Sequence, residues 1–198
     1  MKIITISGAS GSGKSTLAEL IYGSLPNSLL LSLDRYYLSK EEQINKNGYC
    51  NFDYPEAIDG ELLKQDLISL KSKKPTRVPR YDFTISQRSG YEEVSASDCI
   101  IIEGLFAGSL IKDMSDLDIF IEVDLDLALL RRIQRDINQR GRSLASVTEQ
   151  YLRDVRPAYF KHVESIKLNS DMILENNGSE DHLIKATQKI IKKLKLNQ

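Results

Sequence analysis

The feature that most constrains this chain is a glycine-rich segment between an apolar run and a helical pattern. Residues 8–15 read Gly-Ala-Ser-Gly-Ser-Gly-Lys-Ser, which fits the phosphate-binding P-loop pattern G-x-x-x-x-G-K-[ST]. The apolar residues 2–6 before it predict a buried strand, and residues 14–24 after it predict a helix. A strand, this loop and a helix in that order indicate a nucleotide-binding α/β fold.

The chemistry of the loop predicts which residues bind the nucleotide. Glycines let backbone N–H groups turn toward phosphate oxygens, and the helix N-terminus adds partial positive charge. We expect Lys14 to reach the β- and γ-phosphates and the Ser15 hydroxyl to bind Mg²⁺. A chance Gly-Ser loop is the alternative, which the strand–loop–helix context disfavours. The predicted nucleotide-binding residues of this segment are Gly8, Ser10, Gly11, Ser12, Gly13, Lys14, Ser15 and Thr16.

Apolar runs and helical patterns alternate along the rest of the chain. Further strands are predicted at 28–33, 100–102, 119–123 and 172–174, and helices at 61–72, 125–138, 144–166 and after the last strand. Continuous apolar strands separated by helices predict a parallel sheet with helices on both faces. The 125–138 helix is predicted to begin after Asp124 as N-cap and to bury one stripe, formed by Leu129, Leu130, Ile133 and Ile137.

The middle of the chain departs from this alternation. Residues 78–97 contain two extended pieces around Arg88-Ser89-Gly90, which predicts a β-hairpin inserted before the third core strand. Such an insertion is a candidate substrate lid. The length of 198 residues favours a single domain over 1–198, with the hairpin at about 78–97 and an arginine-rich lid at about 131–150, because domains average about 150 residues.

Composition excludes several classes of function. The chain has 27 basic and 28 acidic side chains, so we expect no nucleic-acid or membrane partner, which would favour a basic excess. No apolar run has the length of a membrane-spanning helix, and the first residues lack a signal-peptide pattern. Cys50 and Cys99 are the only cysteines, too few for a disulfide framework or a zinc site. A cytoplasmic protein is the natural expectation.

Two carboxylates follow predicted strands, where open α/β sheets bind their ligands. Glu103 ends a run of three isoleucines, and we expect it to approach Mg²⁺ beside the loop together with Ser15. Asp34 ends the second strand and could accept the proton of an attacking hydroxyl. A turn aspartate is an equal alternative for Asp34 on spacing alone. The candidate metal ligands are Ser15, Glu103 and Asp34.

Five arginines crowd residues 131–142, at positions 131, 132, 135, 140 and 142, with only Asp136 opposing them. A solvated basic face is the usual explanation of such a run. Because transferring phosphoryl groups need cationic clamps, and Gly141 supplies a hinge-like break, we favour a lid that closes over the nucleotide. These features predict a phosphotransferase. A signalling GTPase is excluded, because neither D-x-x-G nor N-K-x-D motifs are found.

At this point the chain resembles the uridine kinase (uridine–cytidine kinase) family of P-loop kinases over most of its length, from Ile3 to about Asn176. Segments beyond the P-loop carry the resemblance. They are Leu33-Asp34-Arg35-Tyr36-Tyr37, Asn51-Phe52-Asp53-Tyr54-Pro55, Pro79-Arg80-Tyr81-Asp82-Phe83, Ile102-Glu103-Gly104, the arginine segment from Arg131 to Arg142, and Gln150-Tyr151.

The resemblance implies a reaction and its participants. The reaction would be ATP- and Mg²⁺-dependent phosphorylation of uridine or cytidine at the 5′-hydroxyl in pyrimidine salvage, with GTP as an alternative donor. Asp34 would be the base, assisted by Lys14 and Arg135, while Arg140 and Arg142 would close over the phosphates. The implied nucleoside-binding residues are Tyr37, Phe52, Asp53, Tyr81, Phe83, Arg132 and Gln150. Many relatives are homotetramers, so homo-oligomerisation is a further expectation.

The chain departs from the family pattern at two positions. Ser86 stands where the family usually has a base-binding histidine, and Tyr54 replaces the histidine of N-F-D-H-P. Serine is shorter and carries no charge, so cytidine, a wider set of nucleosides or another hydroxylated substrate stays open. A phosphoribulokinase-like kinase is the runner-up, and Arg77, Arg80 and Arg88 would serve its phosphorylated acceptor. A non-catalytic nucleotide-binding module is the third alternative.

Overall fold

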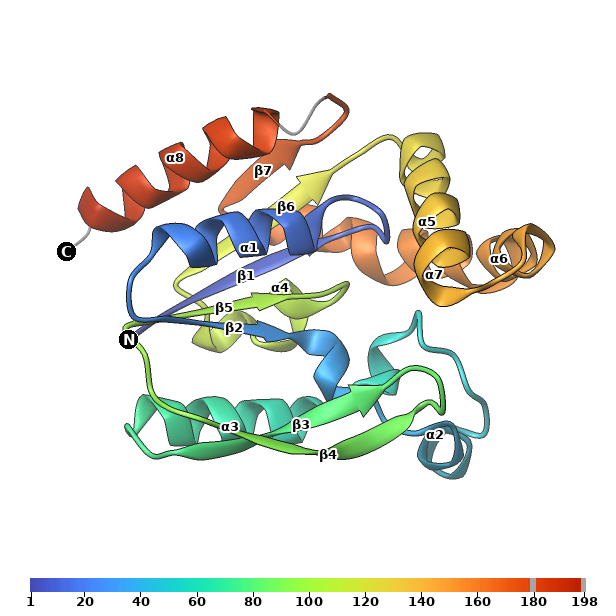
Figure 1. Ribbon diagram of the computed structural model, residues 1–198, viewed down its shortest axis with the longest axis horizontal. Coiled ribbons are helices and arrows are strands. Elements are labelled where there is room, and N and C mark those ends of the chain that lie inside the picture. The colour runs from blue at the N-terminus through green and yellow to red at the C-terminus, as the bar shows by residue number, and fades with distance from the viewer. Residues whose placement is uncertain (179–180, 197–198) are drawn as a thin grey trace.

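The computed structural model describes residues 1–178 and 181–196. Strands and helices alternate along most of the chain (Figure 1). The first half contains β1 (Lys2–Gly8), α1 (Lys14–Ser24), β2 (Ser28–Ser32), α2 (Lys40–Asn47), α3 (Gly60–Lys71), β3 (Thr76–Asp82), β4 (Gln87–Val94) and β5 (Cys99–Glu103). The second half contains α4 (Ala107–Leu110), β6 (Leu117–Glu122), α5 (Leu125–Arg140), α6 (Leu144–Gln150), α7 (Arg156–Ala158), β7 (Met172–Glu175) and α8 (Asp181–Leu196).

The main sheet has five parallel strands in the order β2-β5-β1-β6-β7. In its register Glu103 lies opposite Ile6 of β1 and Ser32 of β2. The segments that leave these three strands therefore start at one edge of the sheet. The predicted parallel sheet flanked by helices is confirmed, and its topology brings the loop after β1, Asp34 and Glu103 to the same place.

The two faces of the sheet bury separate apolar clusters. Ile101 and Ile119 pack with α1 and α8 on one face, whereas Ile100 and Ile102 pack with α3 and Phe106 on the other. Figure 1 shows α1 and α8 side by side on the first face. Alternate side chains of a strand point to opposite faces, so a run such as Ile100-Ile101-Ile102 stabilises both clusters.

The inserted segment forms a separate antiparallel sheet of β3 and β4. Its turn, however, lies at 83–86 and not around Arg88-Ser89-Gly90, which is part of β4. Ser86 has a φ of 53°, in the left-handed region that glycine usually occupies. The prediction placed the turn at Gly90 because glycine is the common turn residue, whereas here Ser86 takes that backbone conformation.

Three further expectations needed correction. The second strand ends at Ser32, because Leu33 starts a 3₁₀ turn that extends to Tyr36. The 144–166 segment is helical throughout, but its parts Tyr151–Val155 and Tyr159–Val163 are π-helical turns. Helix α2 was not predicted at all; a capping box at Ser39 and Glu42 starts it.

The predicted apolar stripe of α5 is wrong. Leu130 and Ile137 are exposed, and the residues that α5 buries are Ala128, Arg132 and Asp136. Asp124 is at the N-cap, although its side chain makes no capping hydrogen bond. Helix α5 thus turns a charged face inward, toward the end of the sheet where β1 and β5 finish (Figure 1).

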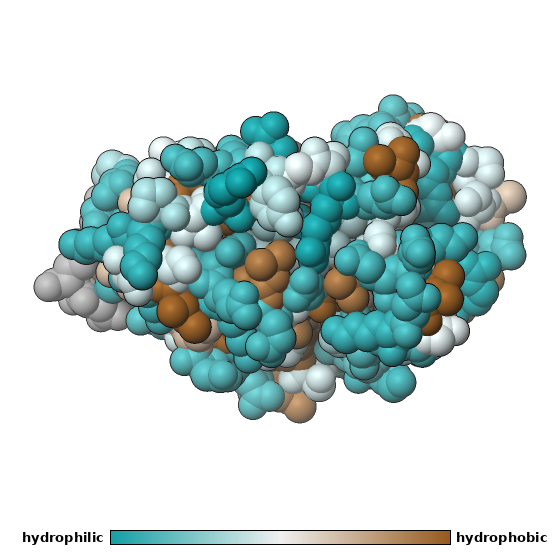
Figure 2. Space-filling model, turned by 90° about the horizontal axis from the view of Figure 1, so that it is seen from below, coloured by the Kyte–Doolittle hydropathy of each residue, from teal (hydrophilic) through white to brown (hydrophobic). Residues whose placement is uncertain are grey.

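The surface view in Figure 2 is mostly hydrophilic, with apolar side chains gathered in small separate groups. No helix within 1–178 and 181–196 combines the length and the apolar character that a membrane span requires. A large cleft lies at the carboxyl edge of the main sheet, between the P-loop, the hairpin and α5.

Candidate active site

A cleft of about 1330 Å³ opens where the P-loop, the 3₁₀ turn after β2, the hairpin and α5 converge. A cleft of this size exceeds the usual range for one small ligand, and it has room for two substrates. Predicted site residues from every part of the chain line it: Ser10, Lys14, Ser15, Asp34, Tyr37, Phe52, Asp53, Tyr81, Phe83, Ser86, Glu103, Arg132, Arg135, Arg140, Arg142 and Gln150.

The remaining predicted residues do not line the cleft: Gly8, Gly11, Ser12 and Gly13 belong to the P-loop segment, and Thr16 lies in the first turn of α1. Gly11 and Gly13 have φ of 86° and 96°. A Cβ at Gly11 would lie 2.3 Å from the Ala128 carbonyl oxygen, and one at Gly13 would lie 2.5 Å from the Asn176 amide nitrogen. These glycines are therefore required by both conformation and space. The Ser12 hydroxyl is buried without a hydrogen-bond partner, so the loop has unused capacity to bind phosphate.

Lys14 is held at the start of α1 with its ammonium group inside the loop. Its Nζ donates a hydrogen bond to the Ala9 carbonyl at 2.8 Å. Burial lowers the pKa of Lys14 to about 8, although the nearby carboxylates of Glu103 and Asp34 act in the opposite direction. A buried ammonium group bonded to only one carbonyl keeps donors free for an anionic ligand.

Two carboxylates and a hydroxyl lie beside Lys14. The Ser15 hydroxyl donates to Glu103 at 3.2 Å. Burial, followed by the negative charge of Glu103, raises the pKa of Asp34 to about 6. Oxygen ligands of this kind suit Mg²⁺, which is bound by few protein groups together with phosphate oxygens. The donor set of Ser15, Glu103 and Asp34 therefore fits a magnesium–nucleotide complex.

Aromatic side chains form the other end of the cleft. The Tyr37 ring lies edge-on to Phe52 at 5.3 Å between centroids, and it also contacts Tyr81 at 5.7 Å. Phe83 at the tip of the hairpin packs against Tyr81 at 5.2 Å. The Tyr37 hydroxyl donates to the Phe52 carbonyl at 3.0 Å, which fixes the ring. These rings offer a flat ligand apolar edges and faces.

A buried ion pair separates the aromatic end from the P-loop. Arg132 lies 3.7 Å from Asp53, and both side chains are more than nine-tenths buried. Arg132 also donates to the Gln150 side-chain oxygen at 3.2 Å. Burial raises the pKa of Asp53, while the charge of Arg132 opposes the shift. The Asp53 carboxylate and the guanidinium together present acceptors and donors suited to a polyhydroxylated ligand.

The other cleft arginines extend from the P-loop to the aromatic end. Arg135 donates to the Ser10 hydroxyl at 3.4 Å, Arg140 lies over the Phe83 ring at 5.3 Å, and Arg142 donates to Gln150 at 2.6 Å. Arg131 differs, because it turns away from the cleft and donates to the Asn176 carbonyl at 3.0 Å. Four of the five arginines of this run therefore face the cleft.

Sequence reasoning missed several residues of this site. Arg35, Glu92 and Gln139 also line the cleft, as does Arg80, which was expected there only for the runner-up kinase. Asp136 lies directly behind the arginines. Asp136 carried a sequence signal, since it is the single acidic residue among five arginines. Gln139 and Glu92 carried none, because their positions depend on how α5 and β4 meet the P-loop.

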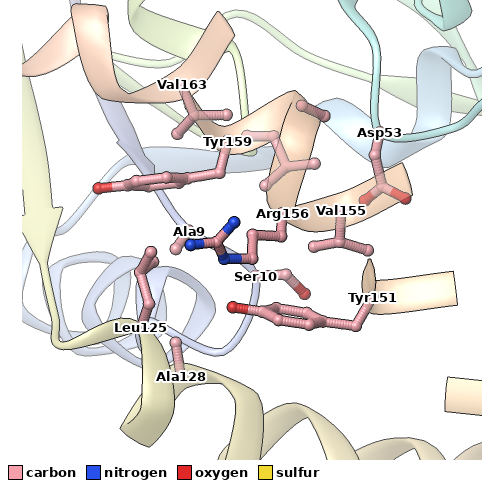
Figure 3. Close-up of a pocket in the computed structure, with 12 residues that line it drawn as sticks. Ala9, Ser10, Asp53, Leu125, Ala128, Tyr151, Val155, Arg156, Tyr159 and Val163 are labelled. Carbon is pink, nitrogen blue, oxygen red and sulfur yellow. The ribbon is translucent and has the colours of Figure 1, made fainter. Parts of the chain in front are cut away.

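A second, much smaller cavity of about 20 Å³ lies behind the P-loop. Figure 3 shows the Arg156 guanidinium between the rings of Tyr151 and Tyr159, above Leu125 and Ala128. The volume of this cavity suffices for about one water molecule. Ser10 and Asp53 border both cavities, so this space supports the back of the site and is too small for a nucleotide.

The sequence profile described as "Phosphoribulokinase / Uridine kinase family" matches residues 3–182. The chain belongs to this family. It is 36% identical over 196 residues to a uridine kinase of Borrelia garinii subsp. bavariensis, covering 98% of this chain and 95% of that protein. It is 40% identical over 189 residues to a uridine kinase of Staphylococcus epidermidis, covering 89% and 88%.

Solved structures with the same fold are more distant in sequence. A possible uridine kinase from Bacillus stearothermophilus has a TM-score of 0.59 and 22% identity, and 87% of each chain is covered. A phosphoribulokinase from Rhodobacter spheroides has a TM-score of 0.64 and 19% identity, with 88% of this chain and 69% of that one covered. At these identities the likeness establishes the fold alone, and it agrees with the parallel sheet and helices of the family member described here.

Proposed function

We propose that this chain transfers the γ-phosphoryl group of ATP to the 5′-hydroxyl of a pyrimidine ribonucleoside, uridine or cytidine, and yields the nucleoside monophosphate. The observation that carries the proposal is the division of one cleft between a phosphate-binding end and an aromatic end, joined by Asp34 and Asp53. The full-length similarity to uridine kinases supports the same conclusion.

The phosphate-binding end supplies charge and geometry for the donor. The P-loop N–H groups, Lys14 and the cleft-facing arginines would hold the polyphosphate. Mg²⁺, when bound with ATP, would neutralise phosphate charge, and Ser15, Glu103 and Asp34 are the oxygen ligands available to it. GTP would present the same phosphates, so this end of the cleft does not select the donor base.

Asp34 is the candidate base for the acceptor. As the nucleoside 5′-oxygen forms a bond to the γ-phosphorus, the bond to the β–γ bridging oxygen breaks, and the hydroxyl proton passes to the Asp34 carboxylate. Burial and Glu103 raise the pKa of Asp34 to about 6. A base with a pKa slightly below neutral is ionised at neutral pH and still able to accept a proton.

The aromatic end would bind the nucleoside. Asp53, with Arg132 and Gln150, would take the ribose hydroxyls, because a buried carboxylate rejects an analogue that leaves it unpaired. Tyr37, Phe52, Tyr81 and Phe83 would hold the base by contacts with their rings. Ser86 also lines the cleft, and we propose that its hydroxyl contacts the base edge in place of a histidine.

A sugar-phosphate kinase of the phosphoribulokinase type is the second candidate. Arg35 and Arg80 line the cleft and could receive an acceptor phosphate. Both, however, lie against Glu92, at 2.9 Å and 3.7 Å. This carboxylate offsets one of their two charges. The aromatic wall and the Asp53–Arg132 pair favour a nucleoside instead.

ADP release from Mg²⁺–ATP tests the proposal, with uridine, cytidine, their 2′-deoxy forms, adenosine and ribulose 5-phosphate as acceptors. We expect turnover with uridine or cytidine and weak turnover with the deoxynucleosides. Asp34→Asn should lower kcat by about 10²- to 10⁴-fold, the usual contribution of a positioned base. Turnover with ribulose 5-phosphate alone would replace the proposal by the second candidate, and ATP binding without any turnover would indicate a non-catalytic module.

We further propose that the protein acts in the cytoplasm as a homo-oligomer. The described cysteines Cys50 and Cys99 are free thiols, which suits a reducing compartment. Sedimentation of the purified protein tests the assembly, with a tetramer as the expected species and a monomer as the contrary outcome.

A further inference from the structure

The most buried charge of the cleft region belongs to a residue that does not line the cleft. Asp136 is 0% exposed, and all its nearest cations are arginines of its own segment. Arg135 lies 2.8 Å from its carboxylate, Arg142 3.3 Å, Arg140 3.5 Å and Arg132 3.8 Å. One carboxylate therefore contacts every arginine of the segment that faces the cleft.

The backbone of Asp136 adds a second constraint. Its carbonyl oxygen accepts hydrogen bonds from the N–H groups of Gly141 and Arg142, the latter at 3.1 Å. Gly141 ends α5 in the left-handed conformation with a φ of 62°. The side chain and the carbonyl of one residue thus fix both the helix end and the guanidinium groups that follow it.

The charges around Asp136 do not balance. Four guanidinium groups meet the carboxylates of Asp136 and Asp53, so positive charge exceeds negative charge within the cluster. The surplus faces the cleft through Arg135 and Arg140, and these two side chains repel each other: the pKa of Arg140 is lowered by burial and by Arg135. The carboxylate of Asp136, which contacts both guanidinium groups, offsets this repulsion.

We propose that Asp136 is a positioning residue that holds the four arginines at the spacing needed to receive the transferring phosphoryl group. This inference rests on the proposed function. Asp136 contacts no substrate; it acts through Arg132, Arg135, Arg140 and Arg142. In its absence the guanidinium groups separate, and the cleft keeps its positive charge but loses the arrangement that stabilises the transition state.

The variant Asp136→Asn separates the positive charge of the cleft, which attracts ATP, from the arrangement of the arginines, which stabilises the transition state. The variant removes one negative charge, so attraction of ATP to the cleft is retained, and we expect the KM for ATP to stay within about threefold of the wild-type value. We expect kcat to fall by about tenfold to a hundredfold, the cost of misplaced catalytic groups. Asp126→Asn is the matched control, since Asp126 is an exposed aspartate of the same helix.

Limited proteolysis gives a readout that needs no acceptor. Trypsin cleaves after arginine, so the rate of cutting after Arg140 and Arg142, mapped by mass spectrometry without nucleotide, reports whether the segment is held. We expect faster cutting in Asp136→Asn than in the wild type and in Asp126→Asn. If Asp136→Asn does not fold by circular dichroism, Asp136→Glu takes its place, because it keeps the charge but displaces the carboxylate by one methylene group.

The outcomes separate this inference from the proposed function. If the wild type phosphorylates no nucleoside, the proposed function fails, and the trypsin comparison still decides the role of Asp136. Unchanged cutting after Arg140 and Arg142 overturns the inference. In an active enzyme, a kcat within about twofold of wild type, or a loss confined to the KM for ATP, also overturns it.

Discussion

The two ends of the cleft are built in different ways. At the phosphate-binding end, Lys14 and Glu103 are buried at the ends of core elements, and the P-loop glycines fit against Ala128 and Asn176 with no space to spare. At the aromatic end, which we call the acceptor end because the nucleoside would bind there, Phe83 is 49% exposed on the turn of a two-stranded hairpin. The first end is fixed by the core of the sheet, whereas the second is formed by loops that meet across the cleft.

This difference sets how strongly each end should respond to substitution. A group fixed by the core cannot be replaced by a neighbour, because close-packed surroundings leave no room to move. An exposed ring on a hairpin shares its role with the adjacent rings and with solvent. Substitutions at the phosphate end should therefore lower kcat steeply, while those at the acceptor end should act on the KM for the nucleoside.

After Asp34→Asn, the largest expected effect is that of Lys14→Ala. Its ammonium group, within the loop, interacts electrostatically with Glu103 and Asp34, and we expect kcat to fall by about 10²- to 10³-fold, as when one preorganised charge donor is removed. Steady-state ADP release measures the loss. Lys189→Ala on the exposed side of α8 is the control and should keep wild-type kcat. A loss in kcat below about fivefold would contradict the expectation that a group fixed by the core at the phosphate-binding end cannot be replaced by a neighbour.

Sequence reasoning succeeded where the core dictates position. Glu103 ends a run of three isoleucines that is typical of a buried strand, and the P-loop follows a second buried strand. It could therefore be predicted that Glu103 and the P-loop meet at one edge of the sheet. The acceptor end could not be predicted from spacing. Phe52 comes from a loop and Tyr81 from β3, and only the resemblance to a family pointed to them; their roles stay predictions.

Two errors have physical causes. The hairpin turn was predicted at Gly90, yet Ser86 adopts the positive φ, and no general preference indicates that a serine will do so. On α5, the apolar pattern predicted Leu130 and Ile137 as the buried side. The helix instead buries Arg132 and Asp136. The ion pair between these two side chains, and the polar cleft that Arg132 lines, compensate for the hydration that both charges lose on burial.

Asp53→Asn tests the region between the two ends. The substitution removes the charge that faces Arg132 at 3.7 Å and leaves a buried guanidinium with a weaker partner. We expect the KM for uridine to rise by about tenfold to a hundredfold, the range for a lost charged hydrogen bond. The KM for ATP should stay near the wild-type value, and the preference for uridine over 2′-deoxyuridine should narrow.

The control for this variant is Asp98→Asn, an exposed aspartate that accepts a hydrogen bond from Asn27 at the opposite edge of the sheet. It should leave both KM values unchanged. Equal increases of the KM for uridine and for 2′-deoxyuridine in Asp53→Asn would show that Asp53 does not bind the 2′-hydroxyl.

Phe83→Ala should have a smaller effect, because Phe83 is half exposed and Tyr81 and Tyr37 remain beside it. We expect the KM for the nucleoside to rise by about threefold to tenfold, with kcat near wild type, as for partial loss of an aromatic contact. Ile85→Ala on the same turn is the matched control; Ile85 is 59% exposed and does not line the cleft. Similar changes in both variants would trace the effect to the turn and not to the ring.

The smallest expected effect is on the pH dependence of nucleoside binding, measured by calorimetry without nucleotide. Burial raises the pKa of Asp53 above its ordinary value, and Arg132 opposes the shift without cancelling it. Protonation of Asp53 therefore begins at a higher pH than for an exposed aspartate, and the protonated form accepts hydrogen bonds less well. Affinity for uridine should be constant above this raised pKa and should be lower by about twofold at it, where half of the Asp53 carboxyls are protonated. Asp53→Asn, which cannot ionise, should show a flat profile; a wild-type profile that is also flat would mean that the charge of Asp53 does not contribute to nucleoside binding.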